Sequence, residues 1–272
     1  MAAARILAVN ADDFGFTRDV NRGIVEAHTR GILTSTTLMA NGAAFDDALE
    51  LAREHPSLDI GVHFVLVQGH SLVTGRPLPR TVAELIRALA LRRMDPYAEL
   101  RAQMLRIVEA GIRPTHLDTH KHTHLLPPVL EAVARLGEEF GVAWVRRPMD
   151  LPLMGSPAGA PWKVRAVSRA MSSLRGRFHR QLAARGCRTT DHFAGFQLTG
   201  RYGAEDVLHL LRRLPAGTTE FMTHPGFCTE ELRGAATRLR ESREAELRAL
   251  TDGRVVAAVQ EEGIRLSPYP IL

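Results

Sequence analysis

Short apolar runs alternate with helix-like segments along this chain, and this alternation is the feature that most constrains its fold. The runs have the length of strands, and the first of them has the continuous hydrophobic character of a strand buried on both faces of a parallel sheet. They lie at residues 6–9, 35–39, 58–66, 142–146, 219–226 and 264–266. The pattern predicts an α/β fold, and 272 residues suffice for a single domain over residues 1–272 with a large core. A (β/α) barrel of this length is ordinary.

The segment 115–124 contains four of the twelve histidines of the chain. If the segment is extended, the two-residue period of a strand places five ligand-type side chains on one side: His116, Asp118, His120, His122 and His124. A helix is expected to begin near Pro127, because proline is favoured in a first helical turn. The histidines would then lie where a strand ends and a loop begins, the edge at which α/β folds bind ligands. The alternative is a solvated loop that is merely rich in histidine.

Other predicted strands also end in polar side chains. Asp12 and Asp13 follow the first run, and two adjacent carboxylates are costly unless a cation or a proton lies between them. Alone, they would fit an Asp-rich turn or a helix cap equally well. His63 lies within an apolar strand, where a histidine is usually a core residue with one hydrogen bond. His224 ends the run 219–226 beside a Pro-Gly turn.

The predicted strand ends thus supply Asp12, Asp13, His63, His120 and His224. Two histidines and one carboxylate can hold a divalent ion and leave some of its positions open. Such an ion lowers the pKa of its bound water, a second carboxylate can accept a proton, and a separate histidine can protonate a leaving group. The pattern predicts metal-assisted hydrolysis of an amide or an ester.

Three further residues are candidates for contact with a substrate. Arg146 and Arg147 end the strand at 142–146 and could bind a polar or anionic group. They could equally pair with Asp118 or with Asp150. Asp191 begins a polar and aromatic stretch that could line a pocket.

The formal net charge is +5 and the isoelectric point is about 9.8. A basic balance can indicate a nucleic acid or an anionic membrane surface. The sequence has no helix-turn-helix pattern and no aromatic pattern of an RNA-binding domain, so we expect no nucleic-acid partner. Two cysteines form no disulfide framework, and the chain has neither a signal-peptide pattern nor a run long enough to span a bilayer. We therefore expect a cytoplasmic protein, for which a homodimer is possible.

The segment 151–190 contains no Asp or Glu, and eight Lys or Arg residues lie between positions 162 and 188. Its apolar residues repeat roughly at helical spacing: Val164, Val167, Ala170, Met171 and Leu174. One interpretation is a helical insertion whose apolar stripe packs on the barrel. The other is a basic amphipathic helix that lies on an anionic bilayer, at the inner face of the membrane.

Four motifs resemble those of the YdjC/ChbG-type carbohydrate deacetylases and occur in the same order. They are NADDFG at 10–15, GVHF at 61–64, THLDTH at 115–120 and THP at 223–225. The resemblance covers nearly the whole chain and is strongest to the branch associated with hopanoid biosynthesis. It implies a distorted TIM-like (β/α) barrel that removes the acetyl group from N-acetylated amino sugars.

By position, the resemblance implies that Asp13, His63 and His120 bind one divalent metal ion, that Asp12 is the general base and that His224 is the general acid. The histidine content favours zinc, and magnesium is the alternative. One of His116, His122 and His124 could hydrogen-bond to a metal ligand and fix the orientation of that ligand.

The branch implies N-acetylglucosamine on a hopanoid glycolipid as the substrate. If the protein is an enzyme, the alternative substrates are soluble chito-oligosaccharides and a phosphoester. A third alternative is a non-catalytic barrel that binds a sugar or a metal. Metal binding alone would require neither Asp12 nor His224.

Overall fold

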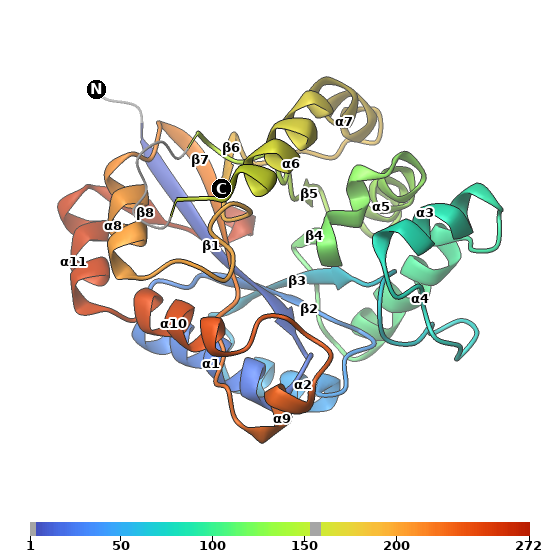
Figure 1. Cartoon of the computed structure of the whole chain (residues 1–272), viewed down its shortest axis with the longest axis horizontal. Helices are drawn as coiled ribbons and strands as arrows, with labels where there is room; N and C mark the ends of the chain where they lie inside the picture. The colour runs from blue at the N-terminus through green and yellow to red at the C-terminus, as the bar shows by residue number, and fades with distance from the viewer. Residues whose placement is uncertain (1–3, 153–158) are drawn as a thin grey trace.

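The structure is a computed structural model, and it describes residues 4–152 and 159–272. One curled sheet of parallel strands forms its centre, in the order β5-β4-β3-β2-β1-β7-β6, with β8 paired to β1 (Figure 1). The strands are β1 (Arg5–Phe14), β2 (Ser35–Leu38), β3 (Asp59–Phe64), β4 (His116–Thr119), β5 (Trp144–Val145), β6 (His192–Ala194), β7 (Gly217–Thr223) and β8 (Ile264–Leu266). This half-barrel confirms the predicted α/β fold of distorted TIM-like barrel type.

Helices connect the strands and surround the sheet (Figure 1). The described helices are α1 (Arg18–Arg30), α2 (Phe45–Glu54), α3 (Val82–Ala90), α4 (Pro96–Glu109), η1 (His120–Leu125), α5 (Pro127–Phe140), α6 (Trp162–Ser173), α7 (Arg175–Ala183), α8 (Ala204–Arg212), α9 (Glu230–Gly234), α10 (Glu241–Leu250), α11 (Gly253–Glu261) and η2 (Tyr269–Ile271). None of these described helices is long and apolar enough to cross a bilayer.

Strand β1 is the central strand of the sheet and is longer than its apolar run at 6–9. One of its edges pairs with β7 over residues 5–11, and its other edge is shared by β8 at residues 5–7 and by β2 from residue 10 onward. Neighbours on both edges and helices on the outside bury its side chains from Leu7 to Phe14. The strand therefore delivers its last residues, including two aspartates, to the carboxyl-end edge of the sheet.

The two ends of the sheet approach each other through irregular backbone pairing. The Arg188 N–H donates to Ala143 O at 2.8 Å, and the Leu151 N–H donates to Phe193 O at 2.7 Å. Strand β6, which the sequence indicated only as a polar and aromatic stretch, borders this junction. These few bonds in place of a regular strand pair explain why the barrel is distorted.

The prediction that residues 115–124 are extended throughout is wrong beyond Thr119. Strand β4 ends there, and the chain folds back as η1, with left-handed φ values of 56° at Lys121 and 52° at His122. The Thr119 hydroxyl accepts the His124 N–H at 3.0 Å and holds this turn closed. The five ligand-type side chains consequently do not share one side, although α5 begins at Pro127 as predicted.

The basic segment forms α6 and α7, and its part at 153–158 lies outside the described residues. The apolar stripe predicted to pack on the barrel is only partly buried. Val164, Ser168 and Met171 face inward, whereas Val167 is 50% exposed and Leu174 is 42% exposed. The inward face is therefore narrower than the sequence pattern indicated.

Candidate active site

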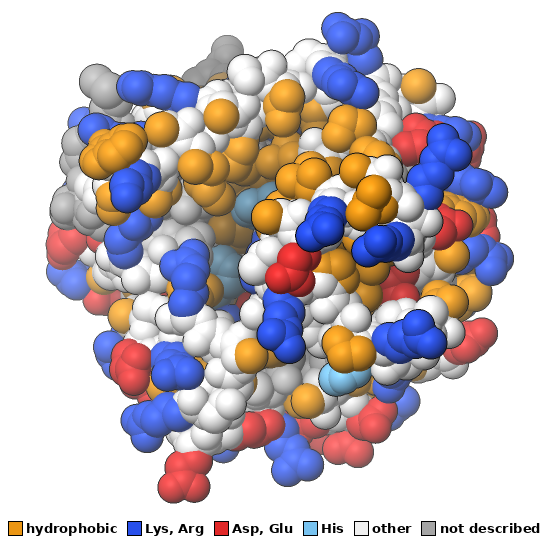
Figure 2. All heavy atoms as spheres, turned by 45° about the vertical axis from the view of Figure 1, so that its right-hand side comes forward, with side chains coloured by type: hydrophobic (Ala, Val, Ile, Leu, Met, Phe, Trp, Pro, Cys, Tyr) orange, Lys and Arg blue, Asp and Glu red, His pale blue; other side chains and the backbone are white. Residues whose placement is uncertain are grey.

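A cavity of about 780 Å³ opens at the carboxyl ends of the strands. Asp12 and Asp13 at the end of β1, His120 after β4 and His224 after β7 all line it. Figure 2 shows it as a hollow with histidine side chains in its depth. Asp13 has a left-handed φ of 72°, and the β1–β2 register shifts between Ala11 and Phe14. This turn in the backbone brings both aspartates to one cavity.

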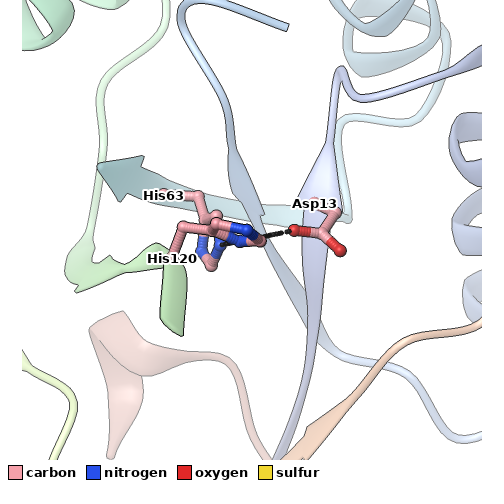
Figure 3. A group of neighbouring side chains, drawn as sticks. All are labelled: Asp13, His63 and His120. Atoms are coloured by element: carbon pink, nitrogen blue, oxygen red, sulfur yellow. Dashed lines mark hydrogen bonds and ion pairs between the residues drawn. The ribbon is translucent and has the colours of Figure 1, made fainter. Parts of the chain in front are cut away.

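Asp13, His63 and His120 point toward one another from three separate strand ends (Figure 3). His63 Nε2 lies 3.4 Å from Asp13 Oδ1, and His120 Nδ1 lies 3.4 Å from the same oxygen. The two ring nitrogens lie 3.3 Å apart. The three atoms form a nearly equilateral triangle that could hold one metal ion.

The spacing and the charge of this triangle both fit a divalent ion. Three ligands about 2.1 Å from one ion stand about 3.4 Å apart at tetrahedral angles and about 3.0 Å apart at octahedral angles. Burial opposes a charge on His63, but Asp118 and Asp13 outweigh it and raise the pKa of the imidazole to about 10. The surrounding carboxylates thus favour a positive charge at Nε2, which either a proton or a metal ion can supply.

Asp12, His63 and Asp118 form a second group of possible ligands. Here the Arg146 guanidinium already lies against both carboxylates, 2.6 Å from Asp12 Oδ1 and 2.7 Å from Asp118 Oδ2. A divalent ion among these atoms would be repelled by that fixed cation. The triangle around Asp13 also has an arginine beside it, but Arg243 binds only Asp13 Oδ2 and leaves Oδ1 open, whereas Arg146 binds both carboxylates of the second group. The triangle is therefore the better metal site.

Asp118 lies behind His63, an arrangement that the sequence did not indicate. The register of β3 and β4 places these residues directly opposite each other, and His63 Nδ1 donates to Asp118 Oδ1 at 2.6 Å. This bond turns Nε2 toward Asp13 and His120 and fixes the tautomer. Only knowledge of the strand register would have revealed the pair, because 55 residues separate the two positions.

Arg146 is 1% exposed and does not line the cavity. Its guanidinium binds Asp12, Asp118 and Glu220 at 2.6–2.7 Å, so the structure has the carboxylate pairing that was the alternative to substrate contact. Burial would raise the pKa of Asp12, but the charge of Arg146 outweighs burial and holds that pKa well below its usual value. Asp12 is therefore ionised at neutral pH.

Side chains of helix α10 also hold the site residues in place, and the sequence did not indicate this role. The many charged residues of this helix are typical of a solvent-exposed helix, yet Arg243 and Glu246 are each 1% exposed. Arg243 pairs with Asp13 Oδ2, which leaves Oδ1 for the triangle. Glu246 accepts the backbone N–H of His224 at 2.6 Å. In a sequence, charged residues at buried helix positions look the same as charged residues on a solvent-exposed helix face. Only their partners in the folded protein distinguish the two.

His224 stands between two carboxylates. Its Nε2 lies 3.8 Å from Asp12 Oδ2, and its Nδ1 lies 3.8 Å from Glu246 Oε2. Burial lowers its pKa, and the two carboxylates offset only part of that effect. The imidazole is therefore mainly neutral at pH 7.

The remaining histidines of segment 115–124 have different surroundings. His116 is buried between Asn10 Oδ1, at 2.9 Å from Nε2, and the stacked ring of Tyr269. His124 is buried, and burial lowers its pKa to about 4. His122 lines the cavity beside Phe196, and its Nδ1 has no hydrogen-bond partner among the described residues.

Two further candidates lie away from the cavity floor. Asp191 is exposed and accepts the Thr218 N–H at 2.8 Å, near the start of β7. His224 follows the opposite end of that strand, so Asp191 is at the other edge of the sheet. Arg147 is 5% exposed and is not among the residues that line the cavity.

The rim of the cavity is cationic. Lys121, Arg201, Arg238 and Arg240 line it, and none forms an ion pair with another described residue. Burial and the neighbouring Arg238 lower the pKa of Lys121. Lys121 also has a left-handed backbone, as do His122, Gln68 and Asp13 around the same cavity. Such strain is typical of sites where function fixes the backbone.

Comparison with known proteins places these observations in a family context. The model of the YdjC-like protein family matches residues 6–261. Among solved structures, the chain is similar to a candidate cellobiose-phosphate cleavage protein from Enterococcus faecalis, with 26% identity, a TM-score of 0.73 and 99% of each chain covered. It also resembles an uncharacterised protein from Agrobacterium tumefaciens, with 12% identity, a TM-score of 0.53, and 100% of this chain and 90% of that chain covered. The second likeness bears on the fold alone.

Proposed function

The chain belongs to the YdjC-like protein family, and we propose that it is a metal-dependent carbohydrate deacetylase. Its reaction is removal of the N-acetyl group from an N-acetylglucosamine-type sugar. The observation that carries the proposal is the triangle of Asp13, His63 and His120. Two of its members, Asp13 and His120, line one cavity with Asp12 and His224, and His63 is buried directly behind them. A divalent ion held there would polarise the acetamide carbonyl and acidify a water molecule.

Asp12 is the proposed general base. Its carboxylate lines the cavity and is kept ionised by Arg146, so it can accept a proton from the attacking water. Asn10 Nδ2 also donates to Asp12 Oδ1 at 3.2 Å. These two donors hold the carboxylate in one orientation, which positions it for proton transfer.

His224 is the proposed general acid for the departing sugar amine. Because burial lowers its pKa, it must gain its proton during the reaction. Asp12 becomes a source once it has accepted the proton of water, and its Oδ2 lies 3.8 Å from His224 Nε2, the nitrogen that does not face Glu246. We therefore assign the order of proton transfer as water to Asp12, Asp12 to His224, and His224 to the amine.

Zinc is the proposed ion and magnesium the alternative. The 3.3–3.4 Å spacing of the ligand atoms supports tetrahedral coordination, and two of the three ligands are imidazoles. Magnesium prefers oxygen ligands at octahedral spacing.

The substrate is proposed to be a glycolipid, as in the branch associated with hopanoid biosynthesis. Apolar side chains in the cavity lining support an apolar group beside the sugar; they are Phe16, Val164, Phe196, Met222 and Leu239. Soluble chito-oligosaccharides are the alternative. For both substrates the proposed location of the protein is the cytoplasm. A glycolipid substrate would also require the protein to reach the inner face of the membrane.

A metal-dependent phosphoesterase is the second candidate function. The unpaired cations of the rim favour it, because they would attract a phosphate group. The second group of possible ligands, Asp12, His63 and Asp118, shares His63 with the triangle and is bound by Arg146, so the described residues favour one ion. This disfavours a phosphoesterase, because phosphoesterases commonly hold two ions about 3.5–4 Å apart.

Assays of released acetate and released phosphate separate these functions. The proposal predicts acetate release from N-acetylglucosaminyl substrates, its loss with a chelator and its return with zinc. Asp12→Asn should lower kcat by about 10²–10⁴-fold, whereas Asp191→Asn, at the opposite edge of the sheet, should not. Release of phosphate without acetate would favour the second candidate. Release of neither product would favour a non-catalytic protein.

A further inference from the structure

The outer face of α6 carries an exposed band of apolar side chains. At 100° per residue, the helix places five of them on its solvent side, and together we call them the α6 apolar band: Trp162, Ala166, Val167, Ala170 and Leu174. Trp162 is 68% exposed, more than any other large hydrophobic residue among those described. Isolated exposed apolar residues are normal, but a band along one helix indicates a contact surface.

Three cations share the exposed side of α6 with this band: Arg165 and Arg169 lie along one side of it, and Lys163 lies within it. Lys163, Arg165 and Arg169 are exposed, and none makes an ion pair with another described residue. Helix α7 adds further arginines, and positions 151–190 contain no Asp or Glu. An exposed helix face that combines apolar side chains with Lys and Arg, and that has no acid, is typical of helices that lie in the interface of an anionic bilayer.

The same helix forms part of the cavity wall. Val164 on its inner face lines the cavity, and Ser168 Oγ accepts from Gln197 Nε2 at 3.3 Å. Gln197 follows Phe196, which also lines the cavity. In Figure 2, hydrophobic side chains gather around the hollow, and Lys and Arg side chains stand near its edge. The outer face of α6 is thus about one helix diameter from the cavity.

We propose that the outer face of α6 binds the surface of an anionic lipid bilayer, with the α6 apolar band in the interface and its cations at the headgroups. A second copy of the chain fits this face poorly, because a two-fold contact would bring the same cations together. An anionic surface neutralises them instead. This inference goes beyond the proposed reaction and does not depend on it.

Trp162 provides a direct probe of this contact in the full-length protein. The chain has two tryptophans, and the other, Trp144, is buried against Tyr269. Vesicles of equal parts phosphatidylglycerol and phosphatidylcholine should shift the emission of Trp162 to shorter wavelength and carry the protein in flotation. Vesicles of phosphatidylcholine alone should do neither, and added salt should weaken the binding.

Two double variants test the two parts of the surface. Arg165→Gln with Arg169→Gln should weaken binding to anionic vesicles about 30-fold. Val167→Ser with Leu174→Ser should weaken it about tenfold. Matched controls are Arg93→Gln with Arg113→Gln and Ile86→Ser with Leu91→Ser, all exposed and distant in sequence from α6. The controls should bind like the wild type, and all four proteins should keep the wild-type unfolding temperature.

Vesicle binding needs neither substrate nor metal, so its outcome is independent of the deacetylase assay. Three results would overturn the inference: equal binding to neutral vesicles, no binding to either kind, or α6 variants that bind like the wild type. A concentration-dependent dimer that Val167→Ser with Leu174→Ser dissociates, without vesicle binding, would show that the band is a protein interface instead.

Discussion

Arg146 shows at the residue scale how one buried cation organises the site. It is 1% exposed and is surrounded by Asp12, Asp118 and Glu220, so none of these carboxylates is left as an isolated buried charge. Arg146→Met should lower the free energy of unfolding by about 3–5 kcal/mol, because it strands buried carboxylates. Urea denaturation measures the loss. Arg185→Met is the control, since Arg185 also pairs with two carboxylates but at the surface, and it should cost far less. Equal losses would contradict the account.

Asp118 is predicted to act on the metal through His63. Asp118→Asn should weaken metal affinity about 10–100-fold, because the amide is a poorer acceptor for His63 Nδ1. Competition with a chromogenic chelator gives the affinity without any substrate. Asp191→Asn should bind metal like the wild type. An unchanged affinity in Asp118→Asn would remove the supporting role of Asp118.

Asp150 is predicted to make stability depend on pH. Burial raises its pKa from 3.8 to about 6, although the backbone N–H groups of Gln197 and Phe196 partly offset this. The folded state therefore holds this proton more tightly than the unfolded state does. Protonated Asp150 therefore contributes to the free energy of unfolding below pH 4. This contribution falls by up to about 3 kcal/mol as the pH rises to about 6.

Urea denaturation of Asp150→Asn and of the wild type between pH 4 and pH 7 isolates this effect. The variant cannot ionise at this position, so its stability relative to the wild type should increase with pH. Any fixed cost of the amide should shift the difference equally at each pH. A difference that stays flat or falls with pH would show that Asp150 ionises normally.

At the scale of elements, the junction of β3 and β4 depends on one glycine. A Cβ at Gly61 would lie 2.4 Å from the His116 carbonyl oxygen, too close for any real contact. Gly61→Ala should therefore separate the two strands and cost about 1–3 kcal/mol of stability, with weaker metal binding because β3 carries His63. Gly203→Ala is the control, since a Cβ there meets nothing within 4 Å. Equal stability of the two variants would contradict the close packing of β3 on β4.

The elements themselves were largely predictable and their irregular parts were not. Six of the strands were expected from runs that contain apolar residues, and the alternating histidines indicated β4. Strand β6 (His192–Ala194) was missed because the polar residues at 189–192 precede and begin it, so the sequence shows no apolar run there. The fold-back after Thr119 is held by hydrogen bonds between the Thr119 hydroxyl and both the backbone N–H and the ring of His124. The spacing of apolar residues in a sequence does not predict such bonds.

At the scale of the whole molecule, the barrel brings together residues that the sequence could identify only as strand ends. That Asp12, Asp13, His120 and His224 line one cavity follows from parallel strands ending at one edge. The supporting residues could not be found in this way. Arg243 reaches Asp13 across 230 positions, and its contact depends on how α10 docks on the finished barrel.

The central claim is that Asp13, His63 and His120 hold one divalent ion. Titrating metal-stripped protein with zinc, in competition with a chelator of known affinity, tests this claim most directly. The account predicts one ion per chain in the wild type and in the exposed-histidine control His70→Ala, and its loss in both His63→Ala and His120→Ala. A wild type that binds no ion, or folded variants that still bind it with full affinity, would contradict the account.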